Sequence, residues 1–183
     1  MRELALHVLD IAQNAEAAGA ATVAIRIVED TAGDSISLSV TDDGKGMDEE
    51  TIARVTDPFY TTRTTRKVGL GLPLLRSGAL ACGGSFSIES KVGEGTVVTA
   101  TYPLRHIDRP PLGDIASTML TILLGNQEID YIYTHDKDGA SFSFASKEMK
   151  EALEGVSFTQ PDVYAWLKEF LAEGEKTLDK SGI

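Results

Sequence analysis

An aspartate–glycine segment in the first third of the chain has the residue types needed to hold a flat, amine-bearing ligand. Asp42-Asp43-Gly44-Lys45-Gly46-Met47 directly follows a stretch with the alternating pattern of a strand. Glycines two and four residues after Asp42 let the backbone turn tightly beneath a planar group. The Asp42 carboxylate can then accept a hydrogen bond from an exocyclic amine such as adenine N6. Taken alone this is a weak pattern, because Asp-Gly turns are common.

A second glycine motif is suited to binding phosphate. Gly69-Leu70-Gly71-Leu72 lies where a polar segment changes to a helical pattern. Exposed backbone N–H groups at the start of a helix favour anions, and the helix dipole adds to that preference. An ordinary flexible joint is the alternative interpretation. The basic residues nearby fit a phosphorylated small ligand or a solvated loop: Arg54, Arg63, Arg66, Lys67 and Arg76.

A polar pair on the first predicted helix could act on the phosphates. Asp10 and Asn14 are one helical turn apart on one face. The Asn14 amide offers a neutral oxygen ligand for Mg²⁺, whose octahedron phosphates and waters would complete. Asp10 could orient or deprotonate a water that attacks a γ-phosphate. The alternative is an amphipathic helix whose outer face is polar.

The elements that position these residues follow from the hydrophobic pattern. A helix over 3–18 is followed by a hairpin, then by the polar segment Met47–Lys67, which begins with a short helix and continues as a lid. A helix over Gly71–Ala81 and a second hairpin follow. The predicted strands are Thr22–Val28, Ser35–Val40, Ser85–Ser90 and Thr96–Tyr102. This order predicts an α/β fold, specifically an α+β two-layer sandwich.

The chain continues beyond a proline-rich boundary at Pro103–Pro111. We therefore predict a domain over 1–104 and a folded, aromatic-rich C-terminal extension over 105–183. The extension is expected to contain helices over 115–124, 147–154 and 162–178 and strands over 129–134 and 140–145. His135 is expected in the exposed turn between these two strands.

Composition limits the classes of function. The 183 residues carry a net charge of −11, which argues against binding to nucleic acid or to anionic membranes. A single cysteine excludes a disulfide framework or a multi-cysteine metal site. The N-terminus lacks the apolar run of a signal peptide, and no 18-residue apolar stretch occurs. We therefore expect a cytoplasmic protein.

In combination, the ordered motifs resemble the GHKL ATPase superfamily of DNA gyrase, Hsp90-type chaperones, histidine kinases and mismatch-repair ATPases. The resemblance covers about residues 4–104 and implies a Bergerat-type ATP-binding fold with ATP and Mg²⁺ as ligands. It implies that Asn14 binds Mg²⁺ and that Asp10 occupies the general-base position. Asp42 would bind the adenine amine, and Thr96 would join the surrounding water network. The other implied nucleotide-binding residues are Gly44, Gly46, Met47, Phe59, Arg63, Lys67, Gly69, Leu70, Gly71 and Leu72.

The two halves of the resemblance indicate different reactions. Asn14–Ala20 is similar to gyrase and mismatch-repair ATPases, whereas Asp57–Leu104 is similar to histidine kinases. We therefore expect a histidine-kinase-like enzyme that phosphorylates a protein partner in trans. A slow ATPase that acts as a conformational switch for a client is the first alternative, and a nucleotide sensor without turnover is the second. A homodimer is compatible with either.

Overall fold

The computed structural model describes residues 3–56 and 71–180. Within these ranges the helices are α1 (Leu4–Ala17), α2 (Glu49–Val55), α3 (Gly71–Ala81), α4 (Ile115–Gly125), α5 (Ser146–Ala152) and α6 (Pro161–Lys180). The strands are β1 (Thr22–Asp30), β2 (Ser35–Asp42), β3 (Ser85–Lys91), β4 (Gly95–Pro103), β5 (Asp130–Lys137) and β6 (Ala140–Ala145). No helix in the described ranges has both the length and the apolar character needed to cross a membrane.

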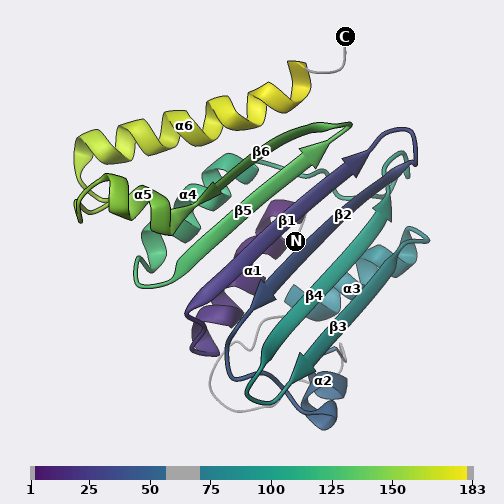
Figure 1. The fold of residues 1–183 in the computed structure, drawn as a ribbon. Coiled ribbons are helices and arrows are strands. Elements are labelled where there is room, and N and C mark those ends of the chain that lie inside the picture. The colour runs from purple at the N-terminus through teal and green to yellow at the C-terminus, as the bar shows by residue number, and fades with distance from the viewer. Residues whose placement is uncertain (1–2, 57–70, 181–183) are drawn as a thin grey trace.

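The six strands form one sheet in the order β3-β4-β2-β1-β5-β6 (Figure 1). All neighbours are antiparallel except β1 and β5, which run parallel. Helices α1, α3 and α4 lie on the same face of the sheet, behind it in Figure 1. The predicted α+β sandwich is therefore confirmed.

Alternation along the strands shows which face carries the core. In β2, Ile36, Leu38 and Val40 are buried, while the residues between them are hydroxyl-bearing and only partly covered. Helix α1 packs onto this face through the apolar stripe of Leu4, Val8 and other buried residues. The predicted site residues Asp42 and Thr96 lie at the end of the sheet where β2 finishes and β4 starts.

The C-terminal extension continues the same sheet. Strand β5 pairs with β1 from Thr22↔Asp130 to Glu29↔Lys137, and β6 then pairs with β5. Helix α4 packs against α1, and α6 packs against α4 and β6. The division into residues 1–104 and 105–183 stays a prediction about domains, although hydrogen bonds and core contacts join the two segments closely.

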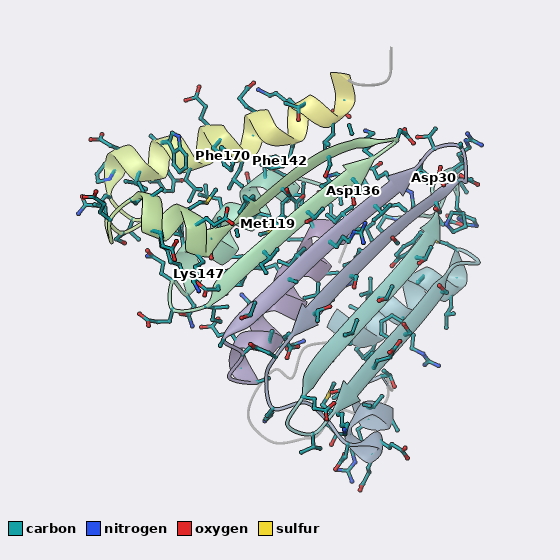
Figure 2. The ribbon with its side chains drawn as sticks, in the orientation of Figure 1. Asp30, Met119, Asp136, Phe142, Lys147 and Phe170 are labelled. Atoms are coloured by element: carbon teal, nitrogen blue, oxygen red, sulfur yellow. The ribbon has the colours of Figure 1, made fainter. Side chains whose placement is uncertain are left out.

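An aromatic cluster attaches α6 to the edge of the sheet. Phe170 of α6 lies 5.5 Å from Phe142 of β6 between ring centroids, and the two residues lie next to each other in Figure 2. Tyr133 and Phe144 continue the cluster inward, and Trp166 stacks on Phe170 toward the surface. These contacts explain why most of the aromatic residues lie in the extension.

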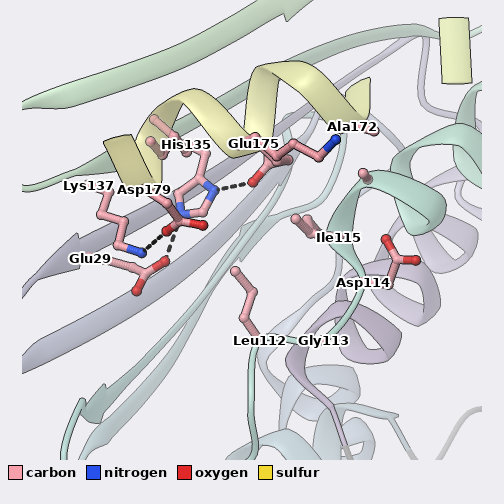
Figure 3. Close-up of a pocket in the computed structure, with 13 residues that line it drawn as sticks. Glu29, Leu112, Gly113, Asp114, Ile115, His135, Lys137, Ala172, Glu175 and Asp179 are labelled. Carbon is pink, nitrogen blue, oxygen red and sulfur yellow. Dashed lines mark hydrogen bonds and ion pairs between the residues drawn. The ribbon is translucent and has the colours of Figure 1, made fainter. Parts of the chain in front are cut away.

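The prediction that His135 lies in an exposed turn is wrong. Strand β5 extends to Lys137, so His135 lies inside the strand and is 2% exposed. Its Nδ1 lies 2.7 Å from a carboxylate oxygen of Glu175 in α6, and its Nε2 lies 3.0 Å from Glu29 in β1 (Figure 3). The Tyr133 hydroxyl also donates to Glu175. The exposed turn begins one residue after the strand, at Asp138.

This polar network borders a cavity of about 460 Å³ between α6, the start of α4 and the sheet. Lys137 pairs with Asp179 at the same cavity. Burial alone would lower the pKa of His135, but the two carboxylates offset burial and raise that pKa to about 9. His135 is therefore a protonated bridge between β1 and α6 at neutral pH.

The free energy of unfolding is expected to decrease as the pH rises from 6 to 9.5. The pKa of His135 is higher in the folded chain than the 6.5 of a free side chain, so its contribution is complete below about pH 6.5 and disappears as the pH passes about 9. The expected loss is on the order of 3 kcal/mol. Urea unfolding at several pH values measures it. The His135→Gln variant should be less stable at pH 6 and lack this decrease, and an equal decrease in the variant would contradict the assignment.

Candidate functional site

Asp42 is held at the end of β2 by its own turn. Its side chain is 9% exposed, and its Oδ1 accepts a 2.8 Å hydrogen bond from the Gly44 backbone N–H. Strand pairing places Asp42 opposite Thr96, near the start of β4. The Asp-x-Gly-x-Gly turn therefore fixes one carboxylate oxygen and aligns the side chain with a buried hydroxyl.

The electrostatics of Asp42 suit recognition of a hydrogen-bond donor. Burial raises its pKa, whereas the backbone N–H groups of Gly44 and Thr96 lower it and the neighbouring Asp43 raises it further. A buried carboxylate with few protein donors binds an added donor strongly, because water competes little there.

Hydrogen bonds to Ser90 determine whether the Thr96 hydroxyl donates or accepts. The Ser90 hydroxyl donates to the Gly95 carbonyl at 2.8 Å and accepts from the Met47 backbone N–H at 2.8 Å. Ser90 Oγ also lies 2.9 Å from Thr96 Oγ1. Because the single Ser90 proton is used toward Gly95, the Thr96 hydroxyl must donate to Ser90. The lone pairs of Thr96 are then available to accept a hydrogen bond beside Asp42.

Close backbone approaches explain three of the glycines. A Cβ on Gly46 would lie 1.9 Å from the Lys91 carbonyl oxygen, and one on Gly95 would lie 2.0 Å from the Asp42 carbonyl oxygen. Both residues also have positive φ, +64° and +105°. A Cβ on Gly44 would lie 2.9 Å from the Ala18 Cβ. Glycine at these positions lets the loop after β2 pack between the β3–β4 hairpin and the end of α1.

The neighbouring Asp43 is a structural residue. Its Oδ1 accepts hydrogen bonds of 2.8 Å from the backbone N–H groups of Ala21 and Thr22. The hydrogen bond from Thr22 is the main cause of its lowered pKa. The Lys45 N–H donates to the Ala18 carbonyl at 3.0 Å. These bonds attach the loop to the connection between α1 and β1.

The first helix brings Asp10 to the start of α3. A Cβ on Gly71 would lie 1.6 Å from Asp10 Oδ2, so the carboxylate is packed directly against this glycine. Burial raises the pKa of Asp10, and the Gly71 backbone N–H lowers it. Asn14, one turn further along α1, is exposed. His7, one turn earlier, is 3% exposed, and burial lowers its pKa.

The remaining predicted residues have different surroundings. Leu72 is 8% exposed and belongs to the hydrophobic core, and Met47 is half-buried beside Ser90. The predictions for Phe59, Arg63, Lys67, Gly69 and Leu70 fall outside the described residues. The described site therefore consists of the Asp42–Thr96 group and the Asp10–Gly71 group, both of which contact α1 or its end.

The residues present fit a magnesium nucleotide. The Asp42 carboxylate and the Thr96 hydroxyl provide acceptors for a base, and the exposed Asn14 amide provides a hard oxygen donor. Two buried polar atoms, His7 Nδ1 and Asp10 Oδ2, lack hydrogen-bond partners among the described residues. In those residues, no group of three or more His, Cys, Asp or Glu side chains could hold a metal ion.

Ser90 is the residue that sequence reasoning missed. Ser90 ends one predicted strand and Thr96 begins the next, so cross-strand pairing should have placed them together. An alternating strand with a serine at its end gave no chemical signal of its own.

The fold and this arrangement are those of an ATP-binding domain, with an Asp-x-Gly-x-Gly turn at one end of a mixed sheet and a helix that carries Asp10 and Asn14 packed against it. The chain belongs to the family described as histidine kinase-, DNA gyrase B-, and HSP90-like ATPase, whose model matches residues 1–106. The suspected resemblance to this superfamily is confirmed.

Bacterial signalling proteins are among the curated relatives. The chain is 40% identical over 97 residues to a non-motile and phage-resistance protein of Caulobacter vibrioides, which covers 50% of this chain and 12% of that protein. It is 39% identical over 108 residues to the sensor protein kinase FleS of Pseudomonas aeruginosa, with 59% and 26% covered. The chain thus spans at most about a quarter of the length of either relative.

Solved structures agree on the fold. One is the ATPase domain of Aquifex aeolicus MutL, complexed with ADP. The match covers 85% of this chain and 68% of the MutL chain, with a TM-score of 0.50 and 17% sequence identity. The N-terminal domain of a DNA repair protein matches 79% of this chain and 53% of its own with a TM-score of 0.51 and 15% identity. At these identities the likeness concerns the fold alone.

Proposed function

We propose that this chain binds ATP with its purine amine on Asp42. The observation that carries the proposal is the buried Asp42 carboxylate, which Gly44 orients and which lies beside the accepting hydroxyl of Thr96. Two neighbouring acceptors favour an amino group, which adenine carries and guanine lacks at the corresponding ring position. Gly46 and Gly95 let the loop after β2 pack against the backbone of Lys91 and Asp42, which holds Asp42 in place.

We further propose that Asn14 holds Mg²⁺ together with the phosphates. Its side chain is exposed on α1, one turn after Asp10. When bound, the cation would neutralise phosphate charge and so lower the barrier to γ-phosphoryl transfer. The contribution of the chain itself is an amide oxygen fixed on a helix whose opposite face is buried in the core.

Phosphoryl transfer to a protein partner in trans is the reaction we propose. The family includes histidine kinases, and FleS of Pseudomonas aeruginosa and sporulation kinase E of Bacillus subtilis are relatives. In this proposal residues 1–104 are the ATP-binding module and residues 105–183 are an attached extension. The phosphoacceptor lies on the partner.

A slow ATPase that switches a client is the second candidate, and one contact favours it. Asn126, at the end of α4, donates a 2.9 Å hydrogen bond to Glu16 in α1. Helix α4 also packs along α1, the helix that carries Asp10 and Asn14. In this candidate, α4 would pass a change at the phosphates from α1 to the extension. Asp10 is the proposed base for the attacking water in this candidate.

Transfer of labelled phosphate in a native extract tests the proposed reaction. The purified chain and [γ-³²P]ATP with Mg²⁺ are added to a gel-filtered extract, and acid-stable and acid-labile protein labels are resolved separately. The expected result is a labelled band that depends on the wild-type chain and does not form with the Asp42→Asn variant. Release of free phosphate without a chain-dependent band would instead favour the ATPase switch.

A further inference from the structure

The Ser90 side chain joins two segments of the candidate site that are far apart in the sequence. Its hydroxyl oxygen accepts a 2.8 Å hydrogen bond from the Met47 backbone N–H in the loop after β2. The same hydroxyl donates a 2.8 Å hydrogen bond to the Gly95 carbonyl at the start of β4. A third contact, of 2.9 Å, joins Ser90 Oγ to Thr96 Oγ1. One short side chain therefore connects the loop after β2 to the β3–β4 hairpin.

Strand register places the Ser90 hydroxyl in line with the proposed base-binding carboxylate. Thr96 in β4 pairs with Ser90 of β3 on one side and with Asp42 of β2 on the other. Paired residues of neighbouring strands present their side chains on the same face of a sheet. Asp42 and Thr96 are each 9% exposed, and Ser90 is half-buried. Because water has little access here, protein partners decide where each hydroxyl proton lies.

The hydrogen bonds of Ser90 leave one arrangement of these protons. The single Ser90 proton lies toward the Gly95 carbonyl, and the Met47 N–H occupies one Ser90 lone pair. The Thr96 hydroxyl then donates its own proton to Ser90. Thr96 therefore offers a ligand only lone pairs, beside an Asp42 carboxylate that also only accepts. The two groups together select a ligand that donates hydrogen bonds.

We propose that Ser90 is a positioning residue that makes the site selective for adenine over guanine nucleotides. Ser90 acts through Thr96, because it takes the proton that Thr96 would otherwise turn toward the ligand. Guanine carries a carbonyl oxygen where adenine carries its amino group, so two acceptors oppose it. Without the Ser90 hydroxyl, Thr96 can donate to that carbonyl oxygen. The inference rests on the proposed function, because it requires a purine at Asp42.

The ratio of the affinities for Mg-ATP and Mg-GTP tests the proposal. Displacement of a fluorescent ATP analogue by each nucleotide measures both affinities. Ser90→Ala should lower the preference for ATP about tenfold, because the Thr96 proton becomes free to meet guanine. Ser90→Thr keeps a hydroxyl and should restore the preference. Ser87→Ala removes the same group from an exposed position on the same strand and should leave the ratio unchanged. A merely structural role would weaken the binding of both nucleotides equally.

A second comparison tests whether Ser90 acts through Thr96. Thr96→Val removes the hydroxyl and keeps the branched shape, so adding Ser90→Ala to Thr96→Val should no longer change the ratio. If Ser90→Ala does not fold, Ser90→Cys takes its place, because a thiol is a poor hydrogen-bonding group of similar size. An unchanged ratio in the single variant, or an equal change in the Thr96→Val background, would overturn the inference and leave the proposed function in place. Failure of wild type to bind ATP would overturn both.

Discussion

Asp42→Asn is expected to weaken ATP binding about a hundredfold while the fold remains intact. The Gly44 N–H will hold the asparagine oxygen where it now holds Oδ1, so the new amide group will face the ligand. A donor then meets a donor at the purine amine, and the charge-assisted bond is lost, together costing on the order of 3 kcal/mol. Calorimetric titration with Mg-ATP measures the affinity, and circular dichroism checks the fold.

The neighbouring aspartate provides the matched control. Asp43→Asn makes the same chemical change, but Asp43 is exposed and its Oδ1 faces the Ala21 and Thr22 backbone. Its lowered pKa indicates that loss of its charge will reduce stability modestly. Affinity for ATP should stay near the wild-type value. Equal losses of affinity in the two variants would show that Asp42 has no special role in recognition.

Gly46→Ala is expected to destabilise the chain strongly and to abolish nucleotide binding. The added Cβ would lie 1.9 Å from the Lys91 carbonyl oxygen, a backbone atom that cannot rotate away. Steric overlap of this kind costs about 1–3 kcal/mol, and positive φ adds about 1–2 kcal/mol. Urea unfolding should therefore show a loss of about 3 kcal/mol or more. The displaced loop would also move Met47 away from Ser90.

The Gly93→Ala variant separates the effect of positive φ from the effect of steric overlap. Gly93 also has positive φ, +82°, but a Cβ there would meet no atom within 4 Å. The variant should lose only the roughly 1–2 kcal/mol that positive φ costs and should still bind ATP. If Gly93→Ala were as unstable as Gly46→Ala, backbone conformation rather than close packing would explain the requirement for glycine.

Local patterns predicted the elements of this fold well, but they did not predict how the extension attaches. The alternation in Ser35–Val40 and the helical stripe in residues 3–18 depend on neighbours in sequence, so both elements are where they were expected. The parallel pairing of β1 with β5 joins distant segments and has no local signal. His135 was misplaced for the same reason, because its carboxylate partners come from β1 and α6.

In the candidate site, too, local contacts could be predicted from the sequence, whereas contacts between distant segments could not. The turn after Asp42 could be predicted from the sequence because the Gly44 N–H bonds the Asp42 carboxylate two residues away. The contacts that require glycine at positions 44 and 46 come from Ala18 and Lys91, which the sequence pattern does not place there. The packing of Asp10 against Gly71 depends on how α1 and α3 cross, which spacing does not reveal. Ser90 acts on Thr96 through the register of a hairpin, and its residue type alone indicates nothing.

Single-turnover analysis with [γ-³²P]ATP tests the central claim most directly. Purified chain in excess over Mg-ATP is sampled over time, and bound ATP, free phosphate and protein-bound label are separated. Wild type should bind the labelled ATP, and Asp42→Asn should bind almost none. Any free phosphate that wild type forms should appear slowly and should not form with Asp10→Ala. If wild type and Asp42→Asn retain equal, background amounts of label, the site around Asp42 is not a nucleotide site.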